Sequence, residues 1–473
     1  MSMAGDATSL GEAIRTGRLT ASEAMKASLA AAGRSAEIGA IVHLDPTLGR
    51  TAAENADARL RHLPGGGRIP PFLGVPSLAK DLGGPFTGLP VAAGSNMLGR
   101  SAAVAEDSDL AARLRAAGLC FFGLTTVPEM GLSLASEPAA GPICRNPLDT
   151  SRTPGGSSGG AAAAVAAGIV AIAHATDAGG SIRVPAACCG LLGLKASRGA
   201  IAAGPSFGNH LGGIASELAL CRSVRDIAAI FDAAAGRARG PFADPWFAPS
   251  PSGPLRVGLL LETGDQFPTE PARSEAVEEA ARALEADGHS VVPMYWDAFA
   301  ASVAASGRAL RDIIAVNLAN FVVSAGLDAG RAERLTQAFI SHGSQLEATA
   351  LWATLDDAVH ASHAVWSLFD RVDCILTPML ASAPLPIGSF PFDHGDIDLQ
   401  ILRMTAFAPL AALANATGFP ALTLPFGADE AGLPLPVQIL APMGGDGLLI
   451  ELAARLEREG RWQHRFAVAG IPE

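Results

Sequence analysis

The sequence predicts an α/β fold, because helix-like and strand-like segments alternate along its 473 residues. Three segments have the apolar periodicity of helices: 20–32, 107–117 and 223–235. Three short apolar runs are typical of buried strands: 119–124, 255–261 and 372–376. A chain of this length can hold about three average domains or one large α/β unit.

The first helix begins with a capping box, in which Thr20 and Glu23 exchange hydrogen bonds across the first turn. Near the middle of the chain, residues 236–253 are rich in Gly, Pro and Ala and are typical of a linker. The linker separates the first half of the chain from a helical part, which we expect to rejoin the sheet near Asp373.

Lys80 lies in an apolar stretch of a chain that has three lysines against thirty-one arginines. Arginine keeps its proton in proteins, whereas burial can make a lysine neutral. The pKa of a lysine must fall from about 10.4 to about 7 to 8 before it can act as a base. The apolar flank supplies such desolvation, so Lys80 is a candidate base. Lys26 is predicted to lie on a solvated helix face, and Lys195 in a turn or cap after a short strand.

Two serine-glycine clusters follow, at residues 153–160 and 176–183. Either cluster alone is consistent with a tight turn. The Ala/Val/Ile run between them predicts a helix that starts near Ser158 and a buried strand over 169–173. Ser181 then lies just past a strand and before Pro185, a residue favoured in the first turn of a helix. Backbone N–H groups near Ser181 would lack helical acceptors and could bind an oxyanion.

Other uses of these clusters fit less well. Neither has the lysine of a Walker phosphate loop or the Gly-x-Gly-x-x-Gly of a dinucleotide site. A nucleophile elbow fails at Ser181 for want of its second glycine, and at Ser157 for want of a later Asp and His in an obvious context. His174 is predicted to be a hydrogen-bonded core or supporting residue rather than a catalytic base. Chemistry that uses serine and lysine is the better hypothesis.

These segments together resemble the amidase signature family. The resemblance rests on three of them: Lys80-Asp81, Gly155-Gly156-Ser157-Ser158-Gly159-Gly160 and Asp177-x-Gly-Gly-Ser181-Ile-Arg183-x-Pro185-Ala186. Five further segments match as well: 123–130, 189–195, 222–226, 418–425 and 432–438. The likeness runs from about residue 8 to the end and thins between about 236 and 370. Leu124 and Thr126 depart from the family's usual Lys and Asn.

The resemblance implies an amidase signature fold, an α/β/α sandwich around a large mixed β-sheet in a single domain over residues 1–473. The signature core would span about 70–235, and a variable helical segment on the substrate side about 254–371. The implied activity is hydrolysis of carbon–nitrogen bonds other than peptide bonds in a small-molecule amide, without cofactor or metal. A homodimer is a possible assembly.

Carried over residue by residue, the resemblance makes Ser181 the nucleophile, Ser157 the bridging serine with a cis peptide, and Lys80 the base. A hydroxyl can donate to one partner while it accepts from another, so Ser157 can pass a proton. The backbone N–H groups of four residues would hold the oxyanion: Ala178, Gly179, Gly180 and Ser181. An acyl-enzyme would form and then be hydrolysed, with release of amine or ammonia.

Three neighbouring side chains are predicted to support this triad. Ser158 would assist Ser157, while Asp177 and Arg183 would form an ion pair or loop clamp rather than bind substrate. The resemblance also implies substrate contacts at two residues and in three segments: Met130, Gly156, 130–137, 205–213 and 300–349.

The identity of the amide stays open. The segments 80–82, 128–130 and 174–181 resemble the bacterial amidases grouped with 6-aminohexanoate cyclic-dimer hydrolase, and aliphatic, aryl and cyclic amides are all compatible. One alternative is the glutaminase subunit of a tRNA-dependent amidotransferase, but its usual Tyr-Asp-Gly-Val-Arg-Tyr-Gly segment is absent from the sequence. Another is a non-catalytic binding protein on the same fold.

Composition excludes several classes of protein. A net charge of -12 and a pI near 5.3 argue against a nucleic-acid partner. The six cysteines lack metal-binding spacing and are predicted to be reduced. The N-terminus lacks the pattern of a signal peptide, and the apolar run from Ala161 is shorter than a membrane span. We therefore expect a cytoplasmic enzyme with no membrane partner.

Overall fold

The computed structural model describes residues 5–62, 69–100, 103–202, 204, 210–236 and 253–471. Most of the predicted linker at 236–253 and part of the predicted substrate loop at 205–213 lie outside the described residues.

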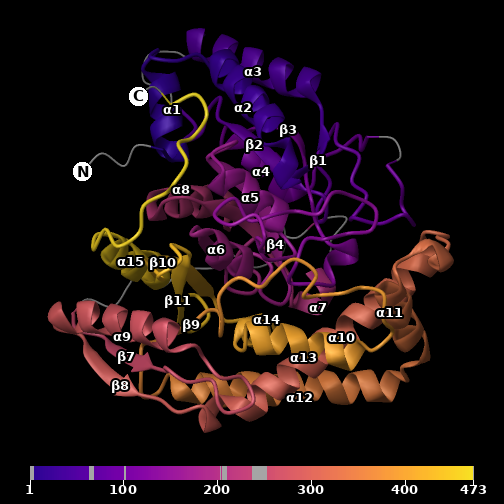
Figure 1. The fold of residues 1–473 in the computed structure, drawn as a ribbon, viewed down its shortest axis with the longest axis vertical. Coiled ribbons are helices and arrows are strands. Elements are labelled where there is room, and N and C mark those ends of the chain that lie inside the picture. The colour runs from indigo at the N-terminus through magenta and orange to yellow at the C-terminus, as the bar shows by residue number, and fades with distance from the viewer. Residues whose placement is uncertain are drawn as a thin grey trace.

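A large mixed β-sheet forms the centre of the α/β/α sandwich (Figure 1). Within the described ranges it has 11 strands in the order β1-β3-β2-β4-β6-β5-β10-β11-β9-β7-β8. The strands are β1 (Ile41–Leu44), β2 (Pro76–Lys80), β3 (Cys120–Thr125), β4 (Ile172–Asp177), β5 (Leu192–Lys195), β6 (Ser216–Cys221), β7 (Arg256–Leu259), β8 (Ser290–Pro293), β9 (Cys374–Pro378), β10 (Ala421–Ala428) and β11 (Pro434–Leu440). Strand β2 is parallel to both of its neighbours, β3 and β4, whereas β4 is antiparallel to β6.

Fifteen α-helices accompany the sheet in the described part of the chain. They are α1 (Ala7–Arg15), α2 (Ala21–Arg34), α3 (Pro46–Arg61), α4 (Asp109–Ala116), α5 (Gly159–Ala166), α6 (Arg183–Cys189), α7 (His210–Gly213), α8 (Val224–Ala234), α9 (Pro271–Ala286), α10 (Asp297–Ser324), α11 (Arg334–Gln345), α12 (Ala348–Leu368), α13 (Ile397–Phe407), α14 (Ala411–Thr417) and α15 (Asp446–Glu457). Three 3₁₀ turns are η1 (Ala36–Ile38), η2 (Glu129–Gly131) and η3 (Ala329–Arg331).

The predicted helices begin where their capping residues stand. Thr20 and Glu23 form the predicted capping box of α2. Ser108 and Ser223 cap α4 and α8 in the same way, because each side chain accepts a hydrogen bond from a first-turn N–H. These caps fix the helix starts to within two residues of the predicted ones.

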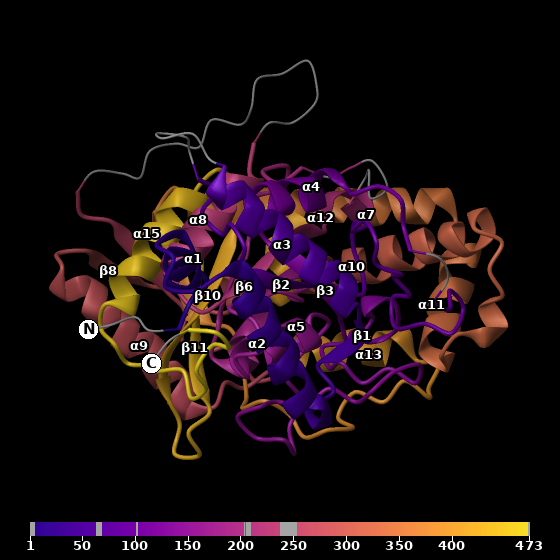
Figure 2. The same ribbon diagram turned by 90° about the horizontal axis from the view of Figure 1, so that it is seen from above.

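The predicted strands are present with shifted boundaries. The predicted strand 169–173 is observed as β4, Ile172–Asp177, so that Thr176 and Asp177 belong to the strand rather than to the loop after it. The predicted helical segment 254–371 also supplies β7 and β8 at one edge of the sheet. Its long helices α10, α11 and α12 gather on one side of the molecule, and α11 and α9 lie at opposite ends (Figures 1 and 2).

No single helix among the described residues has the length and apolar character needed to cross a membrane, although the bent pair α13 and α14 passes the test of length and composition together. All six cysteines are buried and unpaired.

Candidate active site

The candidate site lies where β2 and β4 end. Lys80 is the last residue of β2, and Thr176 and Asp177 are the last two of β4. Because the two strands are parallel neighbours, their carboxyl ends meet at one edge of the sheet, the usual place for a site in an α/β fold. The fold therefore brings together residues that are almost a hundred positions apart in the sequence.

The ammonium group of Lys80 contacts two hydroxyl groups. Its Nζ lies 2.7 Å from Ser157 Oγ and 2.7 Å from Thr176 Oγ1, and it also donates to the Thr176 carbonyl at 3.3 Å. Sequence reasoning predicted a link between Lys80 and Ser157 but missed Thr176. The only signal for Thr176 was its position directly before Asp177 in the second cluster.

Burial changes the acidity of Lys80. The residue is 1% exposed, and desolvation lowers its pKa from 10.5 to about 7, although the negative charges of Asp177 and Glu217 act in the opposite direction. A lysine with this pKa is partly neutral near pH 7 and can accept a proton.

Ser157 lies two residues before the start of α5, and its peptide bond with Gly156 is cis, as the resemblance implies. The loop around it packs tightly: a Cβ on Gly156 would lie 2.6 Å from the backbone N of Ala135. The hydroxyl of Ser136 donates to the carbonyls of Gly155 and Ser157. The structure therefore places Gly156 in the packing of this loop.

Ser158 faces the same strand end as Lys80. Its hydroxyl donates to the Thr176 carbonyl at 3.1 Å and accepts the Thr176 N–H at 3.3 Å, while its own N–H donates to the Ser181 carbonyl. Ser158 thus ties the Ser157 loop to β4 and to the Ser181 loop, a position that suits the supporting role predicted for it.

Ser181 lies between β4 and α6 and is 7% exposed. It lines a cavity of about 370 Å³ together with Ser157 and Thr176. In the part of the chain that the structure describes, Ser181 Oγ makes no hydrogen bond. Met130, predicted to contact substrate, lines the same cavity; Gly156, predicted likewise, is not among the described residues that do.

Asp177 holds the loop that carries Ser181. Its carboxylate accepts hydrogen bonds from the N–H groups of Gly180 at 2.7 Å and Ile182 at 3.1 Å, and forms a buried ion pair with Arg183 at 3.0 Å. Burial by itself raises the pKa of Asp177, but the Arg183 charge and the backbone N–H groups outweigh burial and lower it to about 2.

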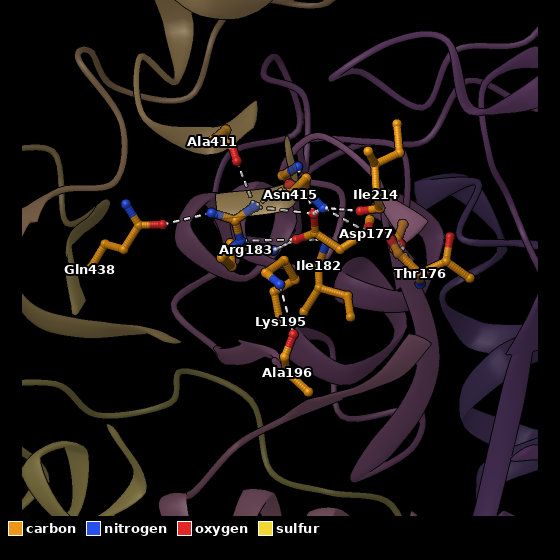
Figure 3. A network of polar contacts seen from close by, with 12 residues as sticks. Thr176, Asp177, Ile182, Arg183, Lys195, Ala196, Ile214, Ala411, Asn415 and Gln438 are labelled. Atoms are coloured by element: carbon orange, nitrogen blue, oxygen red, sulfur yellow. Dashed lines mark hydrogen bonds and ion pairs between the residues drawn. The ribbon is translucent and has the colours of Figure 1, made fainter. Parts of the chain in front are cut away.

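Arg183 in turn is clamped from several sides (Figure 3). Its guanidinium donates to Gln438 Oε1 at 2.8 Å, to the Ala411 carbonyl at 2.8 Å and to Asn415 Oδ1 at 2.7 Å, in addition to Asp177. The pair is fully buried and tied to β11 and α14. Asp177 and Arg183 therefore form the ion pair and loop clamp predicted for them.

The four N–H groups predicted to hold an oxyanion differ in their present partners. That of Gly180 donates to Asp177 Oδ1 and so helps to shape the loop. Gly180 has a φ of +112°, and a Cβ there would lie 2.7 Å from Ala411 Cβ, so the position requires glycine. The N–H groups of Ala178, Gly179 and Ser181 make no hydrogen bond within the described ranges.

His174 supports Lys80 from behind. Its Nδ1 accepts the backbone N–H of Lys80 at 3.2 Å, and its Nε2 lies 2.9 Å from Glu217 Oε2. Because Nδ1 is an acceptor, Nε2 carries the ring proton and donates to Glu217. His174 is a buried, hydrogen-bonded residue, as predicted; its partner Glu217 on β6 was missed.

Asp81 fixes the chain that forms one wall of the cavity. Its carboxylate accepts the N–H groups of Ala92 at 2.8 Å and Gly94 at 3.3 Å and pairs with Arg100 at 2.8 Å. The neighbouring residues Val91 and Ala93 line the cavity. Asp81 is therefore part of the scaffold rather than of the reacting set.

The prediction for Lys195 was wrong. Lys195 ends β5 in the middle of the sheet and is 2% exposed. Its Nζ donates to the Ala196 carbonyl at 2.7 Å (Figure 3), and desolvation, followed by the positive charge of Arg183, lowers its pKa to about 7. The four-residue strand is too short to reveal its burial by pattern. Lys26 is exposed on α2, as predicted.

Comparison with known proteins gives concordant matches. The sequence model of the family described as Amidase matches residues 23–450. The chain is 33% identical to 6-aminohexanoate-cyclic-dimer hydrolase of Paenarthrobacter ureafaciens, over 97% of this chain and 96% of the relative. It is 32% identical to the protein of that name from Pseudomonas sp. strain NK87, with the same coverage of 97% and 96%.

Solved structures agree with these sequence matches. A structure of 6-aminohexanoate cyclic dimer hydrolase superimposes with a TM-score of 0.87 at 31% identity, over 98% of each chain. A bacterial aryl acylamidase of the amidase signature family has the same fold, with a TM-score of 0.83 at 24% identity over 97% of this chain and 96% of the other.

Proposed function

We propose, from the premise that this chain belongs to the amidase family of carbon–nitrogen hydrolases, that it cleaves a small-molecule carboxylic amide through Ser181, Ser157 and Lys80. One observation carries the proposal: a buried lysine with a pKa near 7 lies 2.7 Å from Ser157 Oγ, and Ser157 opens into the same cavity as Ser181.

The first step is activation of the nucleophile. Neutral Lys80 accepts the proton of Ser157, and Ser157 accepts that of Ser181, so that Ser181 Oγ attacks the amide carbon without direct contact with the lysine. Thr176 holds the lysine in place by accepting a hydrogen bond at 2.7 Å. The backbone N–H of Lys80, bound to His174, fixes the main chain behind it.

Attack on the carbonyl produces a tetrahedral oxyanion. The N–H groups of Ala178, Gly179 and Ser181 are its donors in this proposal, and such a donor lowers the activation barrier by about 2.7 to 4 kcal/mol. The N–H of Gly180, the fourth predicted donor, is held by Asp177 and acts by shaping the loop. The Asp177–Arg183 clamp keeps these donors in position.

The two half-reactions conserve protons. The proton taken from Ser181 returns through Ser157 to the leaving nitrogen, which departs as amine or ammonia and leaves an ester on Ser181. Water then attacks the carbonyl carbon of this acyl-enzyme, and its proton passes to Lys80 by the same route. The bond between that carbon and Ser181 Oγ breaks, the proton returns from Lys80 through Ser157 to Ser181 Oγ, and the carboxylic acid is released.

We propose a cytoplasmic enzyme without metal or cofactor; the six buried, unpaired cysteines support a reducing compartment. A homodimer is supported by exposed apolar residues at seven-residue intervals on α12, namely Trp352, Val359 and Trp366.

A serine-reactive fluorophosphonate tests the nucleophile. Wild type should be labelled and Ser181→Ala should not, while Ser344→Ala, which changes an exposed serine on α11, should be labelled like wild type. Amine release from a panel of aliphatic, aryl and cyclic amides then identifies substrates. A well-folded wild type that is neither labelled nor active on the panel would instead favour the non-catalytic alternative.

A further inference from the structure

The long helix α10 forms one wall of the cavity. Five of its lining residues recur at intervals of one to three positions and share one helical face: Ile314, Asn317, Leu318, Phe321 and Ser324. The opposite walls come from the 82–98 region and from Met130, which are largely apolar. At about 370 Å³, the cavity falls within the size range of small-molecule sites.

The described residues that line this cavity include no charged side chain. A substrate that carried a carboxylate or an ammonium group would leave that charge without a partner among apolar walls, which is unfavourable. Three polar side chains of the lining belong to the proposed catalytic site, namely Ser157, Thr176 and Ser181. The other polar side chains among the described lining residues belong to α10: Asn317, Asn320 and Ser324.

Asn317 differs from the other two by its depth. Asn320 and Ser324 are exposed, whereas Asn317 is half-buried beside buried Leu318. Its carboxamide makes no hydrogen bond in the part of the chain that the structure describes. By contrast, Asp312 on the same helix is bound by Arg311, His342 and Thr354. Polar groups removed from water are normally paired, and Asn317 lines the cavity, so its carboxamide has unused hydrogen-bonding capacity for a ligand there.

The chemistry of an asparagine side chain defines its complement. Its carboxamide has an acceptor oxygen and donor NH₂, and it has no charge. A second carboxamide is a neutral group that can pair with both at once, by donating to the oxygen and accepting from the NH₂. We infer that the substrate is uncharged and carries, apart from the bond that is cleaved, a further amide group that Asn317 binds. The inference rests on the proposed function, since it concerns the substrate of that site.

Matched p-nitroanilides test this inference. Their acyl chains have equal length and end in a primary carboxamide, a branched alkyl group of the same shape, a carboxylate or an ammonium; a second series places these groups on the amine side of an alkyl amide. For wild type, kcat/KM should be about 3- to 10-fold higher for the carboxamide than for the alkyl end in one of the two series, the size of one neutral hydrogen bond, and lowest for both charged ends.

Asn317→Leu should remove the preference by lowering kcat/KM for the carboxamide substrate about 3- to 10-fold, with a smaller change for the alkyl-ended one. Asn317→Asp should shift the preference to the ammonium end. Asn55→Leu, the same change on the exposed face of α3, should keep the wild-type preference. Should Asn317→Leu fail to fold, Asn317→Asp alone decides the role of Asn317.

Three results would overturn the inference: a preference that survives in Asn317→Leu, a wild type that favours a charged end, or an Asn317→Asp variant that does not gain on the ammonium end. Hydrolysis of the alkyl-ended substrate by wild type but not by Ser181→Ala would still support the proposed function in each case. Absence of all hydrolysis and of Ser181 labelling would instead contradict the proposed function itself.

Discussion

Two lysines of this chain are buried to the same degree and differ in what surrounds them. Lys80 is 1% exposed and Lys195 is 2% exposed, and burial brings the pKa of each to about 7. Lys80 meets two hydroxyl groups at the edge of a cavity, whereas the Nζ of Lys195 donates to one backbone carbonyl inside the sheet. A lowered pKa makes a lysine able to accept a proton, but only a neighbouring hydroxyl gives it one to accept.

Rarity and an apolar flank do not by themselves distinguish Lys80 from Lys195. Both features describe Lys195 almost as well, since Lys195 is the last residue of the apolar strand β5. What distinguishes Lys80 is the pair of serine loops that the fold places in front of it. The Asp177–Arg183 pair lies between the two regions: the charge of Asp177 affects the pKa of both lysines, whereas that of Arg183 affects the pKa of Lys195.

The largest expected effect is loss of the base. Lys80→Met keeps the apolar stem but removes the proton acceptor, and should lower the rate of Ser181 acylation by about 10²- to 10⁴-fold, the usual contribution of a general base. Phosphonate labelling and amine release both measure it. Lys26→Met on the exposed face of α2 is the control and should retain wild-type rates. A Lys80→Met variant with more than a tenth of wild-type activity would remove Lys80 from the mechanism.

The next effect concerns the clamp between the two regions. Asp177→Asn leaves the Arg183 guanidinium buried without its anionic partner and should lower the free energy of unfolding by about 3 kcal/mol. Asp373→Asn removes a partly exposed partner of Arg256 and should cost less than about 1 kcal/mol. Urea unfolding of both variants checks the difference. Equal decreases in the free energy of unfolding would contradict the conclusion that the Asp177–Arg183 pair stabilises the fold more than the Asp373–Arg256 pair.

Sequence predicted much of this arrangement. A capping box located the start of α2, apolar periodicity located α4 and α8, and the two serine-glycine clusters located the loops of Ser157 and Ser181. The sequence did not reveal the roles of Thr176, Glu217 and Asn317. The register of β4 and β6 pairs Thr176 with Glu217, and Asn317 reaches the cavity from the distant helix α10. The pairing of Thr176 with Glu217 across β4 and β6 is a property of the assembled sheet. No local pattern in the sequence carries such information.

The pH dependence of activity tests the state of Lys80. The mechanism needs neutral Lys80, and its pKa is lowered to about 7. As pH falls through 7 the lysine becomes protonated, so kcat/KM should decrease about tenfold per pH unit below that point and level off above it. Initial rates between pH 5 and 9 measure this acid limb of the pH–rate profile. A limb centred near pH 10 would mean that burial does not shift this lysine.

A smaller effect comes from the charge behind Lys80. Glu217 raises the pKa of Lys80, as does Asp177, while desolvation lowers it. Glu217→Gln removes one negative charge but can still accept the hydrogen bond from His174. The acid limb of the rate profile should therefore move to lower pH, by less than about one unit. An acid limb that stays in place or moves upward would show that Glu217 acts only on the position of His174.

The smallest effect on activity is expected at Lys195, which is buried like Lys80 but does not contact the hydroxyl groups of the site. Lys195→Met removes neither an acid nor a base of the site, so kcat/KM should stay within about threefold of wild type.

The stability of the Lys195→Met variant should nevertheless change with pH in the same way as the stability of Lys80→Met. The unfolded chain binds the lysine proton up to about 10.5 and the folded protein only up to about 7, so this lysine makes wild-type stability rise with pH across that window. Both methionine variants lose one such contribution, and their urea midpoints should rise less between pH 7 and 10 than that of wild type. If Lys195→Met matched Lys80→Met in activity as well as in stability, the cavity-side hydroxyls would no longer explain why one buried lysine is catalytic and the other is not.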